Sequence, residues 1–126
     1  MSEQDESRTF GLDKEILRGI CSPSTELRNE AIYELPDALT SNEISDIAIQ
    51  LSLLPGAKAI NEGRKMETDG LFYIGANALF LKQDIVTAEN VARELRRNGL
   101  MGIVGSLLLK NEIRKTKKEI ITTLTE

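Results

Sequence analysis

The sequence contains no histidine and only one cysteine, Cys21. Without histidine the chain cannot form a His-based catalytic triad, and it lacks the commonest metal ligand. A lone cysteine cannot make an internal disulfide, which fits a reducing cytoplasm. The sequence also has no CxxC pair, no glycine-rich phosphate loop and no Walker lysine. We therefore expect a cytoplasmic protein that is not an enzyme and that binds neither a cofactor nor a metal.

Prolines and aromatic residues are also few, with three prolines and five aromatics among 126 residues. Together with long Leu/Ile/Ala periodicities, this scarcity indicates helices. The length fits one domain that can bury a core without disulfides. No stretch reaches the roughly 20 apolar residues that cross a bilayer. We expect residues 1–9 to be a disordered acidic tail without a targeting signal, and residues 10–126 to form a single all-α domain.

The net charge of -4 is unevenly distributed along the chain. Residues 1–69 carry 14 acidic and 7 basic side chains, whereas residues 70–126 carry 6 acidic and 9 basic ones. Acidic surfaces repel nucleic-acid phosphates and attract basic proteins. The N-terminal half is therefore expected to meet a basic partner, if its charges do more than solvate helix faces.

The stretch that organises the chain is residues 70–82, GLFYIGANALFLK. It holds three of the five aromatics, and between Leu71 and Leu81 only Asn77 is clearly polar. A helix that is apolar on nearly every side is normally buried on nearly every side, so the pattern predicts a central core helix. The alternative is that one side lines a hydrophobic groove with Tyr73 and Asn77 at its mouth.

Three helices are expected before this stretch. The first begins after Asp13, and the second is capped by Ser22 and kinks or stops at Pro36. The third helix, over residues 42–54, has the strongest local signal, because Thr40 and Glu43 have capping-box spacing.

The secondary structure of the remaining segments is predicted from the pattern of polar and apolar residues. We expect residues 57–69 to hold a short turn around 58–62 and then an exposed loop over 63–67. Beyond the central helix, Val86-Thr87 is expected to cap a helix that ends at Asn98-Gly99. Separate helices are then expected over residues 100–109 and 110–126.

One apolar pattern recurs along the chain. Leu27, Ala31, Ile32 and Leu35 are followed 44 positions later by Leu71, Gly75, Ala76 and Leu79, and more loosely by Leu100, Val104, Gly105 and Leu108. Residues 16–35 resemble a HEAT repeat, with its short turn and its Leu-Arg-x-x-Ala-x-x-x-Leu second helix. The second unit departs from the motif, because Phe72 stands where the arginine would be.

The resemblance implies a stack of about three helical hairpins, with residues 111–125 capping its open end. It also implies binding of other macromolecules along an extended surface. An irregular helical bundle is the alternative fold.

The function expected from these observations is a small protein-binding module of unknown oligomeric state. Its sharpest form is an inhibitor or immunity-type protein that neutralises a basic toxin or nuclease. The residues expected to bind the partner are Glu30, Tyr33, Glu34, Asp37, Glu43, Asp46, Glu67, Asp69 and Tyr73.

Two other functions stay open. The first is nucleic-acid binding through Arg93, Arg96, Arg97 and the cluster over residues 110–118, although no aromatics are interleaved there for stacking. The second is a pocket for a small molecule or lipid around Phe72, Tyr73, Asn77 and Phe80.

Overall fold

The computed structural model describes residues 11–56 and 60–125 of the chain. These residues form six α-helices and no strand, so the predicted all-α fold is confirmed. The predicted tail over residues 1–9 lies outside the described residues. The helices are α2 (Lys14–Ile20), α3 (Thr25–Tyr33), α4 (Ser41–Ser52), α5 (Ile60–Lys82), α6 (Ile85–Leu95) and α7 (Gly99–Thr125).

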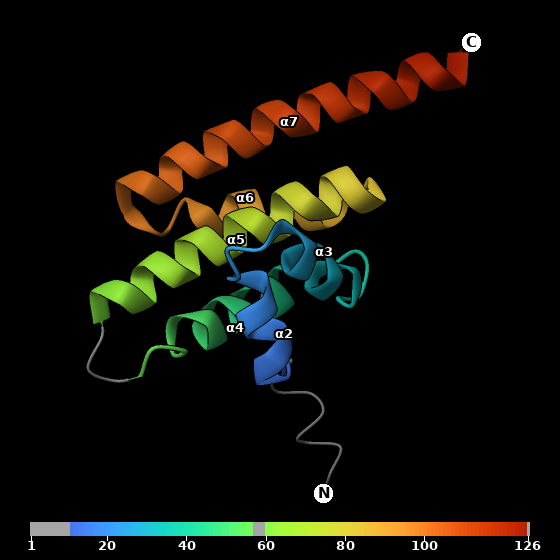
Figure 1. Ribbon diagram of the computed structural model, residues 1–126. Coiled ribbons are helices and arrows are strands. Elements are labelled where there is room, and N and C mark those ends of the chain that lie inside the picture. Colours follow the sequence, from blue (N-terminus) through green and yellow to red (C-terminus); the bar gives the residue numbers. More distant parts are fainter. Residues whose placement is uncertain (1–10, 57–59, 126) are drawn as a thin grey trace, which may run out of the picture.

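The helices pack as three successive hairpins, in which α2 pairs with α3, α4 with α5, and α6 with α7. The second helices, α3, α5 and α7, are neighbours in one layer, and α4 and α6 are neighbours in the other (Figure 1). This pairing resembles a hairpin stack, but α2 makes few or no contacts with α4, so the first hairpin does not continue the second layer. Membership of the HEAT family stays a prediction.

Helix α5 is the centre of the stack, because it contacts each of the other five described helices. The side chains of Leu71, Ile74 and Leu79 are buried in the core. The prediction that this helix is buried on nearly every side is nevertheless wrong at Phe80, which is 80% exposed. A helix in a two-layer stack is covered by its own layer and by the opposite layer, and its outer side stays open.

The predicted loop over residues 63–67 is wrong, since these residues belong to the first turns of α5. Glu, Lys, Arg and Met are good helix formers, and Lys65 pairs with Asp69 one turn later (2.7 Å). Gly63 suggests a break when the sequence is read alone. In the structure it is buried against the Ser52 backbone of α4, where any side chain would collide.

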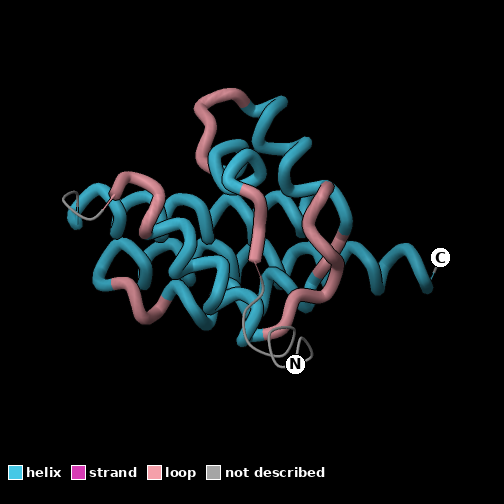
Figure 2. The backbone as a smooth tube through the Cα atoms, turned by 90° about the horizontal axis from the view of Figure 1, so that it is seen from below, coloured by secondary structure: helices cyan, strands magenta, loops and turns pink. Residues whose placement is uncertain are grey.

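The two helices predicted over residues 100–126 are one continuous helix, α7. Contacts between α7 and α6 continue beyond Lys110, since Ile113 is buried and Lys117 pairs with Glu89 of α6 (2.9 Å). In both views the C-terminal end of α7 projects beyond the other helices (Figures 1 and 2). A separate capping helix is therefore absent from the described residues.

Helix α7 exposes most of the third unit of the recurring pattern. Leu100, Val104 and Leu108 are all exposed, and only Gly105 of that unit is buried. The buried residues are Gly102, Gly105, Ser106, Leu109 and Ile113. Small residues bring α7 close to α6, and the Ser106 hydroxyl donates to the Ala92 carbonyl (2.7 Å).

Two helix caps lie two or three residues away from their predicted positions. Ser24, not Ser22, caps α3 by accepting from Leu27 N–H (3.3 Å). Asp84 caps α6 by accepting from Thr87 N–H (3.2 Å), so the predicted Val86-Thr87 cap is also wrong. The predicted capping box of Thr40 and Glu43 at α4 is confirmed.

Asp84 also ties two hairpins together. Its carboxylate accepts from the Thr87 hydroxyl (2.6 Å) and from Ala38 N–H (2.9 Å), while the Thr87 oxygen accepts from Leu39 N–H (2.9 Å). Burial acts to raise the pKa of the Asp84 carboxyl. The hydrogen bonds from Thr87 and Ala38, with the nearby Lys82 charge, outweigh burial and lower that pKa below its usual value.

We expect Asp84→Ala to lower the free energy of unfolding by about 1–2 kcal/mol at pH 7. Because the folded-state pKa is depressed, this stability is present above the unfolded pKa of about 4 and is lost as the pH falls through the folded value. Urea unfolding from pH 7 down to pH 2.5 measures the shrinking difference. Asp13→Ala is the control, because Asp13 caps α2 without a side-chain hydrogen bond.

Two glycines of α7 give opposite predictions. A methyl group at Gly102 would meet the Leu95 carbonyl oxygen, which is backbone and cannot move aside, so Gly102→Ala should destabilise by about 1–3 kcal/mol. At Gly105 a methyl group finds ordinary contacts at 3.5 and 3.6 Å, so Gly105→Ala should stabilise by about 0.5–1 kcal/mol. Equal effects in thermal unfolding would contradict this packing of α7.

Candidate functional site

The nine residues predicted to bind a partner lie in three places. Glu30, Tyr33 and Glu34 lie on and just after α3, with Asp37 in the following connection. Glu43 and Asp46 lie on α4, in the opposite layer. Glu67, Asp69 and Tyr73 lie on α5. The structure therefore does not bring the nine together into one surface.

The residues on α3 form the most exposed of these groups. Glu26, Glu30 and Glu34 follow one another at four-residue spacing, which places them on one side of the helix. All three are exposed, and Tyr33 beside them is 58% exposed. Leu27, which belongs to the same apolar pattern as the buried Ala31 and Ile32, is 52% exposed next to them. We call Glu26, Glu30, Tyr33 and Glu34 the acidic face.

Two of the predicted partner-binding residues already interact with other groups of the same chain through their carboxylates. Asp37 pairs with Lys82 (3.1 Å), whose ammonium group also donates to the Leu35 carbonyl (2.8 Å). The Glu43 carboxylate accepts from Thr40 N–H (2.9 Å) in the capping box. Asp46 is half-buried on α4, and its backbone carbonyl accepts from the Gln50 side chain (3.2 Å).

The three predicted residues on α5 point in different directions. Glu67 is half-buried near the junction of α6 and α7, and this burial raises the pKa of its carboxyl. Asp69 pairs with Lys65, and the Tyr73 ring lies under the Arg28 guanidinium at 4.4 Å. That cation–π contact joins α3 to α5, so Tyr73 holds the layer together as well as facing outward.

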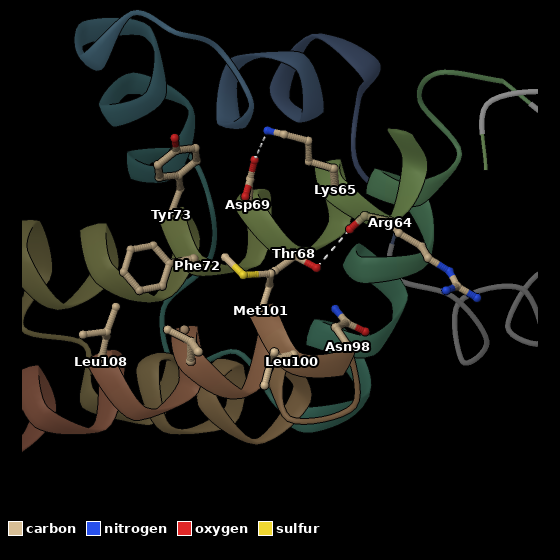
Figure 3. Close-up of a pocket in the computed structure, with 12 residues that line it drawn as sticks. Arg64, Lys65, Thr68, Asp69, Phe72, Tyr73, Asn98, Leu100, Met101 and Leu108 are labelled. Carbon is tan, nitrogen blue, oxygen red and sulfur yellow. Dashed lines mark hydrogen bonds and ion pairs between the residues drawn. The ribbon is translucent and has the colours of Figure 1, made fainter. Parts of the chain in front are cut away.

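An apolar groove of about 780 Å³ lies between α5 and α7 on the outer side of their layer (Figure 3). Phe72 from α5 and Met101 from α7 point toward one another across it. Tyr73 lines the groove as the sequence suggested, but Asn77 and Phe80 do not. Its other apolar lining residues come from α7 and are Leu100, Val104 and Leu108.

The residues that the sequence suggested for a pocket all belong to α5, which forms only one wall of this groove. The contribution of α7 was missed, because Leu100, Val104 and Leu108 have the helical spacing of a core stripe. The available signal was Gly102, Gly105 and Ser106, a second and smaller stripe on the same helix that can pack closer.

One end of the groove carries charges of both signs, because Asp69 also lines it and Glu67 lines the adjoining depression. Arg64 and Lys65 line it, and Arg97 lies in an adjoining depression with Arg64 and Asn98. Two of these cations have acidic neighbours, since Lys65 pairs with Asp69 and Arg97 with Glu94 (3.7 Å). The first turn of α7 starts at the same end and adds the positive end of its dipole.

The basic residues of the alternative hypothesis are only partly brought together. Arg93, Arg96 and Lys110 line a depression that also contains Glu89. Lys117 pairs with Glu89 (2.9 Å), and Arg97 lies on the other side of α6. No aromatic residue lines this depression, so it offers no ring on which a base could stack.

The comparisons with known proteins give no family for this chain. No protein-family model, curated protein or solved structure matches it. Among the described helices, none is long and apolar enough to cross a membrane. Residues 11–56 and 60–125 also contain no group of three acidic or cysteine side chains that could hold a metal ion.

Cys21 should react slowly in the folded protein. Burial, with the nearby Asp69 charge, raises the pKa of its thiol to about 11. At pH 8 the thiolate fraction is then about a hundredfold below that of an ordinary cysteine. We expect alkylation by iodoacetamide to be slow in buffer and fast in urea. An equal rate in both would contradict the described packing of Cys21 beside α5.

Proposed function

We propose that the protein is a protein-binding module whose acidic face docks a basic surface of its partner. The observation that carries this proposal is the run Glu26, Glu30 and Glu34 beside exposed Tyr33. Within the described part of the chain, no ion pair involves these glutamates. Their charge is therefore available to a partner, unlike that of Asp37 or Glu43.

Tyr33 and Leu27 provide contact area that can be buried on binding, which charged side chains alone do not. Exposed charges attract a partner from a distance, but affinity depends on a few anchors that are buried on binding. A tyrosine gives a large contact area at low entropic cost, and Leu27 adds apolar area next to it. The most specific version of this proposal is that the protein inhibits a basic toxin or nuclease.

Charge reversal at two positions tests the acidic face. Affinity purification with the wild-type protein is expected to enrich basic proteins, and Glu30→Lys with Glu34→Lys should reduce their recovery about tenfold or more. Added salt should slow association with the wild type, because electrostatic steering is screened. Quantitative mass spectrometry of the recovered proteins, followed by binding kinetics, measures both effects.

Glu119→Lys is the matched control, since Glu119 is also exposed on a helix but lies far from α3. It should leave recovery unchanged, and circular dichroism should be the same for all variants. If nuclease treatment removes the enriched proteins, or if reversing Arg93 and Arg96 abolishes binding while the α3 changes do nothing, the basic-face alternative replaces this proposal.

A further inference from the structure

We propose that the acidic face docks on the third hairpin of a second copy of this chain, so that copies associate head to tail. The proposal rests on the proposed function, because it names a partner for the same acidic face. The second copy is inferred from three features of the layer formed by α3, α5 and α7, which are the charges at its two ends, the direction of its helices and their register.

The third hairpin carries an excess of positive charge on the side that faces away from α5. Helix α5 packs against both α6 and α7, so the depression that lies between these two helices and contains no α5 residue is on their other side. Arg93, Arg96 and Lys110 line this depression. Arg114 is exposed one turn beyond Lys110 on the same side of α7. We call these four residues the basic end.

The carboxylates of α6 and α7 do not balance the basic end. Glu89 lines the same depression, but its carboxylate already pairs with Lys117 (2.9 Å). The remaining carboxylates of the two described helices have other neighbours, since Glu94 pairs with Arg97, Glu112 pairs with Lys115, and Glu119 borders a different depression. Within residues 11–56 and 60–125, no ion pair involves a member of the basic end.

The acidic face lies at the opposite end of the layer. Glu26 and Glu30 project from the side of α3 that is opposite to its buried residues. Arg28, the only cation of this helix, lies instead over the Tyr73 ring of α5 (4.4 Å). A second copy therefore carries an unbalanced surface of each sign. The charges in and next to the neighbouring α2 cancel one another and are Asp13, Lys14, Glu15 and Arg18.

Helices α3, α5 and α7 run in the same direction. Residues in contact advance together along neighbouring helices, which happens only when the helices are parallel. These contacts are Arg28–Tyr73 and Leu35–Lys82 between α3 and α5, and Phe72–Gly105 and Gly75–Leu109 between α5 and α7. A copy added beyond α7 in the same orientation would place its α3 parallel to α7 and would continue the layer.

The register of the layer brings opposite charges together. Because Arg28 is level with Tyr73 and Phe72 is level with Gly105, Glu30 is level with Lys110 to within about one helical turn. A copy shifted across the layer keeps this level, so two glutamates of one copy would lie opposite the basic end of the other. Such complementarity favours binding in this orientation. The spacing agrees as well, since Leu27, Glu30 and Glu34 are separated as are Leu107, Lys110 and Arg114.

Apolar side chains accompany the charges on both surfaces. Leu27 and Tyr33 are exposed beside the glutamates of α3. Ile103 and Leu107 precede Lys110 on the same side of α7, and they are exposed although neither lines the groove between α5 and α7. Burial of these four side chains gives the contact an apolar part, which charge pairing in water does not supply.

An interface of this kind joins two different surfaces. Each copy that docks through its acidic face still offers its basic end to the next copy. Association of this heterologous type does not stop at a dimer unless the copies close into a ring. The mean mass of the particles should therefore keep rising with protein concentration.

Sedimentation velocity of the full chain tests the proposal. Between about 1 µM and 1 mM protein the mean mass should rise above that of the monomer in about 0.01 M salt, and it should fall back in about 1 M salt. Glu30→Lys with Glu34→Lys should weaken self-association about tenfold or more, because like charges then meet. Arg96→Glu with Lys110→Glu should have the same effect from the other surface.

An equal mixture of these two double variants provides the decisive measurement. Each variant alone repels its own copies. In the mixture, the acidic face of one variant meets the unchanged basic end of the other, and the two reversed surfaces also carry opposite charge. Self-association should therefore return to within about threefold of the wild type. Circular dichroism should be the same for both variants.

Lys118→Glu with Glu119→Lys is the matched control. Both residues are exposed on α7, line a different depression and leave the net charge unchanged when they are reversed together. This variant should self-associate within about twofold of the wild type. A loss as large as that of the other two variants would contradict the proposed contact.

Three further results would overturn the proposal. A wild-type protein that stays monomeric up to about 1 mM has no such contact. A mixture that stays monomeric would show that the two surfaces do not meet. A dimer that Leu108→Glu dissociates and the charge reversals leave intact would place the contact in the groove between α5 and α7. In each case the proposed function still holds if the α3 variant loses the basic proteins that the wild type recovers.

Discussion

The burial of α5 is the constraint on which the rest of the structure depends. Leu71 and Ile74 are fully buried, and α5 contacts every other described helix, so no hairpin can move without opening this core. Close packing then determines where small residues must lie. Gly63 lets α4 approach, and Gly75 faces Val91 and Leu109 from the third hairpin. Side chains at these positions would separate the hairpins, because protein interiors are packed at the density of organic crystals.

A two-layer stack leaves the outer side of each layer uncovered, and the exposed apolar residues follow from this geometry. In the layer formed by α3, α5 and α7, the neighbouring helices leave a groove between α5 and α7, because Gly105 faces Phe72 with no side chain of its own. Helix α6 is much shorter than α7, so the C-terminal end of α7 projects past its partner (Figure 1). The apolar groove and the projecting end of α7 therefore both lie where no neighbouring helix covers the surface.

The uneven distribution of charge along the sequence places acidic and basic side chains at opposite ends of the structure. The acidic face belongs to α3 in the first hairpin, whereas the exposed basic residues belong mainly to α7 in the third. The two lie at opposite ends of the same layer, with the apolar groove between α7 and the central helix. A partner that approaches this layer meets negative charge at one edge and positive charge at the other. Such an arrangement favours one orientation of a partner over the reverse.

The sequence by itself determined the helical content, the capping box of α4 and the central place of residues 70–82. These are local properties, since Thr40 and Glu43 cap α4 through neighbouring backbone groups and an apolar run must be buried somewhere. Tertiary structure alone decided the rest. Gly63 lies within a helix because the Ser52 backbone packs against it. Helix α7 buries Gly102 and Ser106 and exposes Leu100 and Leu108, because close approach to α6 outweighs the burial of its larger apolar stripe. Which of two stripes faces the core depends on the surface that the rest of the chain presents, and no local pattern carries that information.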